Sequence, residues 1–518
     1  MGREDEVIKA RLKKIEELRK KGINPYPNNF SMDSDSAGLQ KKYEKLKSEG
    51  ESKDSVKIAG RLMIIRDMGK IAFASLQDSY GKIQILLQEK ETPDKVFEFF
   101  KNYIDAGDIV GVEGTICRTK RGELSVRVKK LELLTKSINP LPEKWHGIVD
   151  EEEKLRKRYL DIIMNPEIKQ LFIKKYKFWA TIRDFLIERG FLQVETPILE
   201  TSAGGASATP FKTHHNALDM DVFLRISQGE LWQKKLMVAG YDKTFEIGRL
   251  FRNEGMDMEH LQDYTSMEFY WAYANYKDGM KLTEEMYKKV AMEVLGTLKF
   301  KTHGYEVDLG KKWENYDYEK LIKEKTGIDI YKDDVKKIMK KLTELKIEFD
   351  PKADKWRLVD CLWKFCRKQI SGPGFLINQP VEVSPLAKRN SEDPRKVEQF
   401  QIIFAGSEMG NGYSELNDAI DQEERFKKQQ EMKEKGDSES MSHDFEFVEA
   451  LKYGMPPTCG FGVSERFFSY LMDKPIRECQ IFPLMKPIKE EKSEVKVEEK
   501  KEEKHDKKEI KTKEGKKK

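Results

Sequence analysis

Two arginines stand three residues apart in segment 245–255, FEIGRLFRNEG, which has the alternation of a β-strand. Successive strand side chains point to opposite faces, so Arg249 lies with the apolar residues and Arg252 lies with Glu246 and Gly248. A carboxylate, a guanidinium and a residue without a side chain suit a polar ligand that lies close to the backbone. This second face of the strand is therefore predicted to bind a ligand.

A second strand is predicted over 264–273, YTSMEFYWAY, after a short polar loop. Its odd positions are mostly apolar and are expected in the core, whereas its even positions are polar. If the two strands pair antiparallel, they share one polar surface. The members of that surface are Arg252, Glu254, Tyr264, Glu268 and Tyr270. The alternative is an amphipathic hairpin with an ordinary solvated face.

Two carboxylates, Glu408 and Glu415, lie in segment 406–418, GSEMGNGYSELND, with Asn411 between them. Mg²⁺ takes oxygen ligands in proteins, usually one or two carboxylates together with phosphate oxygens and water. The segment is therefore compatible with a Mg²⁺ site. The alternative is a turn that carries ordinary surface glutamates.

A glycine-bearing strand, TCGFGVS, is followed by a helix that is predicted to open near Glu465 and Arg466. Gly460 and Gly462 would let a planar ligand approach the backbone, and Arg466 could reach a phosphate. A glycine pair at a β-bulge is the commoner explanation of such a motif. The chain has no GxxxxGK[ST] loop, so a bound nucleotide would have to be held by arginines and metal.

Secondary-structure elements must position these motifs, and the pattern of apolar and polar residues changes along the chain. At least five short β-rich runs with glycine-containing turns begin at Val56, which is typical of a small five-stranded oligonucleotide-binding barrel. The expected order is a helical extension (1–52), the barrel (53–138), a linker (139–165), a second α+β domain (166–487) with a helical insertion (about 279–350), and a charged tail (488–518) that is expected to be disordered.

Composition limits the class of protein. The 518 residues are too many for one core, and the 96 Lys and Arg nearly balance the 91 Asp and Glu, so the net charge of +5 permits a polyanionic partner without arguing strongly for one. Five cysteines without a CxxC pair fit a reducing compartment. The charged N-terminus and the lack of a long apolar run predict a soluble cytoplasmic protein with no membrane span.

Together, in this order, the motifs resemble those of the class II aminoacyl-tRNA synthetases, and in detail the lysine-specific family. The resemblance extends from about residue 5 to residue 487. It is carried by LRKKGINPYPNNF, AGRLMIIRDMGKIAFASLQD, ETPILETSAGGASATPFKTHHNALD, FEIGRLFRNEG, PVEVSPLAKR, EMGNGYSELND and IFPLMKP. It implies a catalytic domain with an antiparallel sheet flanked by helices, a homodimer, Mg²⁺ as cofactor, and L-lysine, ATP and tRNA(Lys) as substrates.

The resemblance also implies roles for single residues around ATP. Arg252 would be catalytic and bridge the amino-acid carboxylate and the α-phosphate, and Arg466 would be catalytic on the other face of the nucleotide. The remaining implied contacts are Glu254 to the adenosine part, His260 to the distal phosphates, Tyr264 stacked on adenine, and Glu408 and Glu415 as the ligands of Mg²⁺.

An acidic pocket would recognise lysine, because a buried ammonium needs anionic partners. The implied residues are Gly205 and Glu230 for the α-amino group, Asn411 for the carboxylate, and Glu268, Tyr270 and Glu415 for the ε-ammonium. The substrate carboxylate is already a nucleophile, so no general base is assigned.

In the barrel, the resemblance implies that Arg66, Phe73, Gln84 and Glu123 read the anticodon. Phe73 offers a stacking face worth ~1–3 kcal/mol per base, and Gln84 and Glu123 can hydrogen-bond a uracil edge. Phe73 taken alone would more often be a packing aromatic. The match of all four positions favours the anticodon.

The chain departs from the family pattern at four places. GFGVSER is one residue shorter before its arginine, LQDY replaces an Asn-Pro-Glu-Phe run, Glu259 stands where a basic residue is common, and ISQGEL has one extra residue before Glu230.

His214 and His215 are adjacent, so they cannot share one metal, and structural hydrogen bonds are expected. Three hypotheses follow: an active lysine–tRNA ligase, a non-catalytic tRNA-binding relative, or the same enzyme type with another amino acid.

Overall fold

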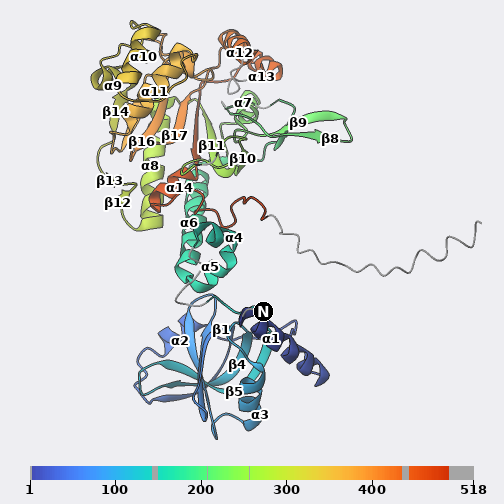
Figure 1. Ribbon diagram of the computed structural model, residues 1–518. Helices are drawn as coiled ribbons and strands as arrows, with labels where there is room; N and C mark the ends of the chain where they lie inside the picture. Colours follow the sequence, from blue (N-terminus) through green and yellow to red (C-terminus); the bar gives the residue numbers. More distant parts are fainter. Residues whose placement is uncertain are drawn as a thin grey trace, which may run out of the picture. The chain divides into compact units, whose positions relative to one another are not determined.

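Figure 1 shows the computed structural model of the chain, in which residues 3–142, 150–202, 204–206, 208–255, 257–434 and 443–488 are described. The chain divides into two compact units, residues 1–164 and 165–518. The predicted charged tail lies outside the described residues from position 489 on, as do residues 143–149 of the predicted linker. None of the helices in the described ranges is both long enough and apolar enough to cross a membrane.

Five strands of the first unit close into the predicted barrel, in the order β1-β2-β3-β5-β4. Alternation in the sequence builds it, since Ala72, Ala74 and Leu76 of β2 are buried and the residues between them are only half-buried. Neighbouring strands are antiparallel except β3 and β5. The elements are β1 (Glu51–Asp67), β2 (Ile71–Gln77), β3 (Lys82–Gln88), α3 (Asp94–Tyr103), β4 (Ile109–Arg118) and β5 (Leu124–Thr135).

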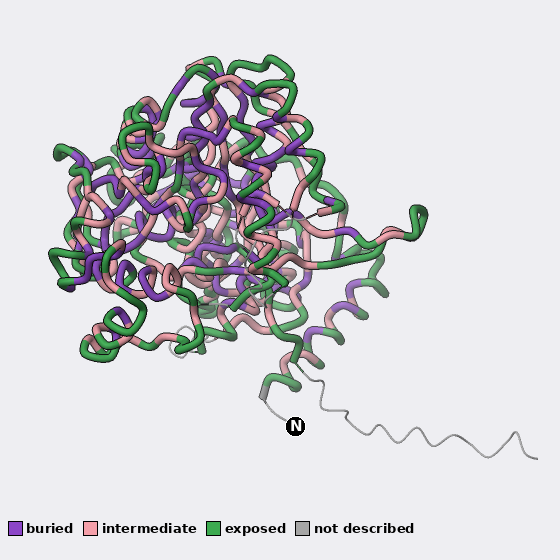
Figure 2. Tube along the Cα trace, turned by 90° about the horizontal axis from the view of Figure 1, so that it is seen from above, coloured by how far each residue is buried: buried purple, intermediate pink, exposed green. Residues whose placement is uncertain are grey.

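Two helices precede the barrel, α1 (Arg3–Lys20) and α2 (Ser36–Lys42). Arg11, Ile15 and Leu18 form the buried stripe of α1, at the spacing of one helix face. Figure 2 shows these buried positions recurring along the helix beside the N mark. The rest of this helix is polar and largely exposed.

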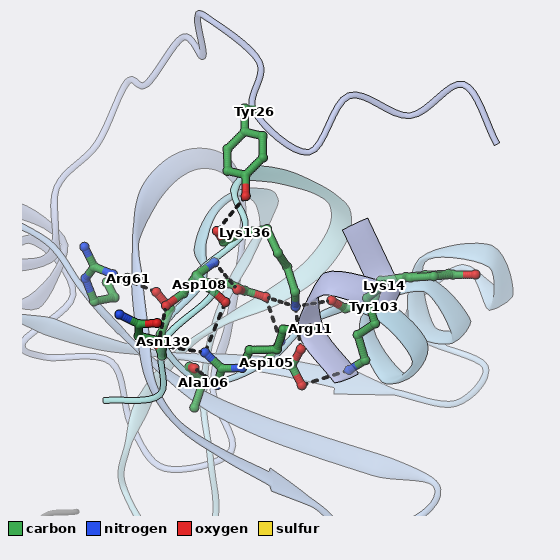
Figure 3. A network of polar contacts seen from close by, with 12 residues as sticks. Arg11, Lys14, Tyr26, Arg61, Tyr103, Asp105, Ala106, Asp108, Lys136 and Asn139 are labelled. Atoms are coloured by element: carbon green, nitrogen blue, oxygen red, sulfur yellow. Dashed lines mark hydrogen bonds and ion pairs between the residues drawn. The ribbon is translucent and has the colours of Figure 1, made fainter. Parts of the chain in front are cut away.

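A buried network of charges holds α1 against the barrel (Figure 3). At its centre the ammonium of Lys136, which is 2% exposed, lies 2.7 Å from a carboxylate oxygen of Asp108 and 2.5 Å from one of Asp105. Asp105 also accepts a hydrogen bond from Lys14 of α1 at 2.8 Å. Breaking one partner of a buried ion pair typically costs about 3–5 kcal/mol. The network therefore makes α1 part of the barrel unit.

The predicted linker contains two short helices, α4 (Glu151–Arg156) and α5 (Arg158–Met164). Asp150 begins the first of them, because its carboxylate accepts hydrogen bonds from the backbone N–H groups of Glu152 and Glu153. The segment predicted as a linker, 139–165, is therefore partly helical.

An eight-stranded sheet organises the second unit, in the order β14-β15-β16-β17-β18-β11-β10-β6. As predicted, its strands are antiparallel, except at the two edges, where β14 pairs with β15 and β6 pairs with β10 in parallel. The strands are β6 (Leu192–Gln193), β10 (Lys243–Phe251), β11 (Asp263–Ala272), β14 (Glu314–Asp317), β15 (Gly374–Ile377), β16 (Gln399–Phe404), β17 (Ser407–Ser414) and β18 (Thr458–Ser464).

Three helices pack with this sheet into the main core: α6 (Pro166–Ile187), α8 (Tyr276–Leu295) and α14 (Arg466–Leu471). Aromatic rings fill much of the space between them. Phe400 of β16 and Phe461 of β18 stack with ring centroids 5.6 Å apart. This packing gives the central strands a rigid support.

The predicted helical insertion over 279–350 was wrong at its start. Leu282, Met286 and Val290 of α8 are buried in the main core, so α8 belongs to the sheet domain and its charged residues cover only the outer face. A separate helical cluster lies beside β14 and β15 (Figure 1) and is centred on the buried Trp363. Its helices are α9 (Tyr318–Thr326), α10 (Val335–Glu344) and α11 (Lys355–Arg367).

The run FLQVETPIL forms two short strands, β6 and β7 (Leu199–Glu200), with Pro197 between them. Proline has no N–H to donate and interrupts a ladder. Strand β7 pairs instead with β9 in a three-stranded sheet of order β7-β9-β8. The remaining elements are α7 (Glu230–Val238), β8 (Lys212–His215), β9 (Met220–Leu224), β12 (Lys299–Thr302), β13 (Tyr305–Asp308), η1 (Val381–Val383), α12 (Ala419–Glu434) and α13 (Phe445–Lys452).

Candidate active site

A cavity of about 480 Å³ lies on the central strands of the eight-stranded sheet. It is lined by residues of β10, β11, β17 and β18, by the start of α7 and by the chain around Gly205. All site residues predicted in this unit line it except Glu254 and His260. Those that line it are Gly205, Glu230, Arg252, Tyr264, Glu268, Tyr270, Glu408, Asn411, Glu415 and Arg466.

Strands β10 and β11 form the predicted antiparallel pair, with Leu250 opposite Tyr264, so the predicted polar surface exists. Gly248 has a different role from the predicted one. A Cβ atom there would lie 2.5 Å from Nη2 of Arg225 and 2.6 Å from Nε2 of Gln228. The glycine therefore makes room for two protein side chains, and it does not line the cavity.

A β-bulge in β17 decides which of its residues face the cavity. The pairing with β16 passes from Gly410 to Glu408 within one step of β16, so Met409 is an extra residue. In a regular strand Glu408 and Asn411, three positions apart, would point to opposite faces. With the bulge, both line the cavity.

The glycines of β18 leave space for the acidic residues of neighbouring strands. A Cβ atom on Gly460 would lie 2.1 Å from Oε1 of Glu415 and 2.7 Å from the ring of Tyr270, and one on Gly462 would lie 3.1 Å from Glu268. The register of β18 with β11 and β17 is regular. The explanation by a β-bulge at these glycines was therefore wrong.

The acidic end of the cavity contains an internal cation, Lys234 of α7, which is fully buried. Its Nζ lies 2.7 Å from Oε1 of Glu230 and 2.5 Å from Oε2 of Glu415. The hydroxyl of Tyr413 also donates a hydrogen bond to Glu230. The chain thus supplies one ammonium to this end from its own helix.

The third carboxylate of this end, that of Glu268, has neutral partners. It accepts hydrogen bonds from the backbone N–H of Gln228 at 2.8 Å and from the hydroxyl of Tyr270 at 3.1 Å. Burial, and then repulsion from Glu230, raises the pKa of Glu268 to about 7. Lys234 pairs with two of the three carboxylates at this end, and Glu268 forms no ion pair with the described residues, which leaves an excess of acidic groups.

Glu415 has the same tendency to hold a proton. Burial raises its pKa to about 8, although the ammonium of Lys234 acts to lower it. Oε1 of Glu415 is buried without a hydrogen-bond partner among the described residues. An unpaired carboxylate oxygen in a pocket with excess acidic groups can take up a cation from a ligand.

The other end of the cavity carries arginines. Nε of Arg252 donates to the carbonyl of Ile226 at 3.2 Å, and its guanidinium lies 5.9 Å from the ring centroid of Tyr264. No carboxylate of the described residues forms an ion pair with Arg252. Its charge is therefore free to meet an anionic ligand.

Glu254 and His260 lie outside the cavity lining. Glu254 is exposed beyond the end of β10 and accepts a hydrogen bond from the backbone N–H of Thr209 at 3.2 Å. The His260 ring lies 2.8 Å from Asp257 on one side, and its Nε2 lies 2.8 Å from Nη2 of Arg466 on the other. His260 therefore reaches the site through Arg466.

The predicted Mg²⁺ pair is not formed as expected. Glu408 and Glu415 line the same cavity, but Glu415 is bound by Lys234, and Oε1 of Glu408 accepts from Trp363 at 2.9 Å and from Arg367 at 2.7 Å. The described part of the chain contains no group of three or more His, Cys, Asp or Glu that could hold a metal ion. The residues present do not fit a Mg²⁺ ion held between these two carboxylates.

The barrel has its own groove, of about 950 Å³, lined by all four predicted anticodon residues, Arg66, Phe73, Gln84 and Glu123. Phe73 is half-buried and lies opposite Arg66 in the pairing of β1 with β2, while Nε2 of Gln84 donates to Ser125 at 2.8 Å. The same groove is lined by basic side chains. These are Lys82, Arg118, Lys120, Arg121 and Arg127.

The adjacent histidines have structural roles, as predicted. His214 lies 3.2 Å from Asp221, and Nδ1 of His215 accepts from the backbone N–H of Leu218 at 3.2 Å. All five cysteines are free.

Lys234, Trp363 and Arg367 were missed by the sequence reasoning. Lys234 stands four residues after Glu230, the spacing of an ion pair on one helix face, which could have indicated their contact. The contacts of Trp363 and Arg367 with Glu408 join residues 45 and 41 positions apart, for which the sequence carries no signal.

Comparison with known proteins agrees with this geometry. Residues 150–486 match the family model described as tRNA synthetases class II (D, K and N), and residues 56–134 match the OB-fold nucleic acid binding domain. The chain is 43% identical over 496 residues to a lysine–tRNA ligase of Thermosipho melanesiensis, covering 95% of this chain and 98% of the relative.

Two further lysine–tRNA ligases are equally similar. That of Thermotoga maritima is 44% identical over 493 residues, with 94% of this chain and 98% of the relative covered. That of Fervidobacterium nodosum is 44% identical over 481 residues, with 92% and 94% covered. The cavity brings Arg252, which forms no ion pair with the described residues, together with an excess of carboxylates. The matches to lysine–tRNA ligases cover nearly the whole chain. The chain therefore belongs to the lysine–tRNA ligase family of the class II tRNA synthetases.

Proposed function

We propose that this enzyme joins L-lysine to tRNA(Lys) with ATP, through a lysyl-adenylate. The observation that carries the choice of amino acid is the acidic end of the cavity, where Glu230 and Glu415 pair with the ammonium of Lys234 and Glu268 forms no ion pair with the described residues. A substrate with its own ammonium group would balance the excess of acidic groups. A neutral isostere would leave buried carboxylates unbalanced, and such a mismatch is strongly rejected.

In this proposal the ε-ammonium of lysine is enclosed by Glu268, Tyr270 and Oε1 of Glu415. The α-amino group lies near Gly205 and Glu230. These assignments are supported by the shared cavity and by the unpaired oxygen of Glu415. The lysine carboxylate then points toward Arg252 and the nucleotide.

Adenylate formation requires positioning and charge stabilisation. A carboxylate oxygen of lysine attacks the α-phosphorus of ATP, a new P–O bond forms, and pyrophosphate leaves. Arg252 stabilises the charge that grows on the α-phosphate, and Arg466 holds the nucleotide from the other side, so both act as preorganised donors. A ribose hydroxyl at the 3′ end of tRNA then attacks the lysyl carbonyl, and AMP leaves.

ATP would enter as its Mg²⁺ complex, so the ion arrives as part of the substrate. Tyr264, 5.9 Å from the guanidinium of Arg252, offers a face for adenine. Glu254 and His260 would contact the nucleotide only at its rim, because they lie outside the cavity lining.

The barrel groove would read the anticodon. Phe73 presents a half-buried ring for stacking, and Arg66, Gln84 and Glu123 surround it with hydrogen-bonding groups. The basic side chains along the groove would hold the phosphate backbone. Because its proposed substrates are tRNA(Lys) and ATP, the enzyme would act in the cytoplasm.

A homodimer would cover the edge of the sheet at β6, the last strand in its order. Apolar side chains are exposed around this edge, which is unusual for a free surface. These are Ile187, Leu192, Ile198 and Leu199. Analytical ultracentrifugation would test this part, since Leu192→Asp should give monomers if the edge is the interface.

The test of the function is ATP–pyrophosphate exchange, run with each of the twenty amino acids, followed by transfer to tRNA. Exchange with lysine alone is expected. Exchange with another amino acid would overturn the assignment of the pocket. Tight tRNA binding without any exchange would instead favour a non-catalytic relative.

A further inference from the structure

Glu408 is paired with a cation of the chain itself. We propose that Arg367 takes the place of a protein-bound Mg²⁺ at Glu408, so that adenylate formation uses Mg²⁺ only as the counter-ion that ATP brings with it. The inference rests on the proposed function for its role in catalysis. Its central claim, that Glu408 binds a guanidinium in preference to a metal ion, can be measured without any reaction.

The contact comes from one face of α11. Trp363 and Arg367 are four residues apart, so they project side by side, and both donate to the same oxygen, Oε1 of Glu408, at 2.9 and 2.7 Å. Trp363 is 2% exposed and anchors the helical cluster. Two donors of one helix thus converge on one carboxylate oxygen, which makes Arg367 a built-in partner of Glu408.

The charges around Glu408 are balanced. Glu259 accepts hydrogen bonds from the hydroxyls of Ser407 and Tyr470 at 2.8 Å, and it lies 3.8 Å from Nε of Arg466. Two carboxylates therefore share their surroundings with two guanidinium groups. A divalent cation placed here would be repelled by both arginines.

The neighbouring strand offers no further carboxylate. The cavity-facing residues of β16 are the neutral amides Gln399 and Gln401, and Nε2 of Gln399 donates to Asn411 at 2.7 Å. Mg²⁺ prefers a site with several oxygen ligands in octahedral order and is rarely held by one carboxylate that is already paired.

Arg367 would act through its neighbours, as a positioning residue. Nη1 of Arg466 donates to the backbone carbonyl of Glu408 at 3.2 Å, so the strand that Arg367 holds also orients the arginine of the cavity. Nε of Arg466 is buried without a hydrogen-bond partner among the described residues. A phosphate oxygen of ATP would satisfy it.

The first experiment measures Mn²⁺ binding to the full-length enzyme without ATP, by electron paramagnetic resonance of the free ion. Wild type is expected to bind no Mn²⁺ at micromolar concentrations. Arg367→Met, which keeps the length but removes the charge, should gain a Mn²⁺ site, and adding Glu408→Gln should remove it. Wild-type binding that Glu408→Gln abolishes would overturn the proposal, as would a lack of gain in Arg367→Met.

The second readout is the Mg²⁺ dependence of lysine-dependent exchange at fixed ATP. Wild type should saturate once Mg²⁺ equals ATP, whereas Arg367→Met should fall by about 10²-fold there and recover with excess Mg²⁺. Arg367→Lys should restore the wild-type profile, and Lys364→Met, on the exposed side of α11, is the matched control. The same profile in wild type and Arg367→Met would contradict the proposal.

The two readouts separate the hypotheses. Absence of exchange with every amino acid would remove the proposed function, yet the Mn²⁺ titration would still decide whether Arg367 occupies the cation position. Circular dichroism checks that each variant is folded. If Arg367→Met does not fold, wild type and Glu408→Gln still test the proposal, because Mn²⁺ binding by wild type that Glu408→Gln abolishes would overturn it.

Discussion

Glu246 of β10 and Glu268 of β11 lie directly opposite each other, two carboxylates in one cross-strand pair. Opposed like charges destabilise a strand pair. Here they differ in chemistry, because Glu246 forms a buried ion pair with Arg225 at 2.6 Å, whereas burial and repulsion from Glu230 raise the pKa of Glu268 to about 7. The charge of Glu246 is neutralised inside the fold, whereas Glu268 forms no ion pair with the described residues and can accept a cationic ligand.

Lysine binding should therefore depend on pH. The pKa values of Glu268 and Glu415, about 7 and about 8, mean that both carboxylates are largely protonated below these values and cannot balance an ammonium. The dissociation constant of L-lysine should fall as the pH rises from 6 to 8.5, by up to about tenfold per pH unit for each proton released. Isothermal titration calorimetry would measure it. In Glu268→Gln, binding should be weaker and its pH dependence shallower; an unchanged slope would contradict the role of Glu268.

The stability of the ligand-free enzyme against unfolding should decrease as the pH rises, whereas its affinity for lysine should increase. Both pKa values are raised above the ordinary 4.5, so the folded state binds more protons, and the stability from these two groups is present at low pH and lost as the pH rises through 7 and 8. The Tm of the free enzyme should thus fall between pH 6 and 8.5, and saturating lysine should offset the fall. Differential scanning calorimetry of wild type and Glu415→Gln would show it. Parallel curves for the two proteins would rule the explanation out.

Arg252→Ala should lower lysine-dependent exchange by at least about 10²–10³-fold, the usual effect of removing one donor that stabilises transition-state charge. The fold should be kept, because Arg252 forms no ion pair with the described residues. Arg249→Ala is the matched control, since Arg249 is exposed and pairs with Asp263. Near-normal exchange in Arg252→Ala would refute its catalytic role.

Gly460→Ala should impair lysine binding, because the new methyl group would lie 2.1 Å from Oε1 of Glu415. Overpacking of this kind costs about 1–3 kcal/mol. Gly462→Ala should be milder, since its nearest contact, with Glu268, is 3.1 Å. The KM for lysine in exchange would measure both. Equal effects, or none, would show that the pocket is looser than the structure indicates.

Phe73→Ala should weaken binding of tRNA(Lys) by about 1–3 kcal/mol and leave exchange unchanged, because stacking on the anticodon is lost while the adenylation site is intact. Filter binding with tRNA(Lys) and a non-cognate tRNA would measure the loss of discrimination. Tyr80→Ala is the control, since Tyr80 is exposed outside the groove. A drop in exchange would instead mean that Phe73 is mainly structural.

The parts of this molecule that could be predicted from sequence are those set by local periodicity. Alternation over β10 and β11 is enough to place Arg252 and Tyr264 on one surface, and the glycine-punctuated runs are enough to predict a barrel. The family resemblance then brought in Gly205, which has no local signal and yet lines the same cavity.

The parts that could not be predicted depend on partners distant in the chain. A carboxylate at position 408 looks like a metal ligand until Arg367 is seen beside it, and only folding brings α11 to β17. In the same way, the many charged residues of α8 led to its assignment to a helical insertion. Its buried residues Met286 and Val290 belong to the main core.

The extra residue in β17 has a consequence for how this site can change. The side chains of a strand alternate in parity, and Met409 resets that parity between Glu408 and Asn411. Deletion of Met409 would leave Glu408 two positions before Asn411, so both side chains would still share one face of a regular strand, whereas regular pairing of β17 with Met409 retained would turn Glu408 to the opposite face. The alignment of the arginine-bearing half of the site with its acidic half therefore depends on how β17 pairs with β16 as well as on the residues at positions 408 and 411.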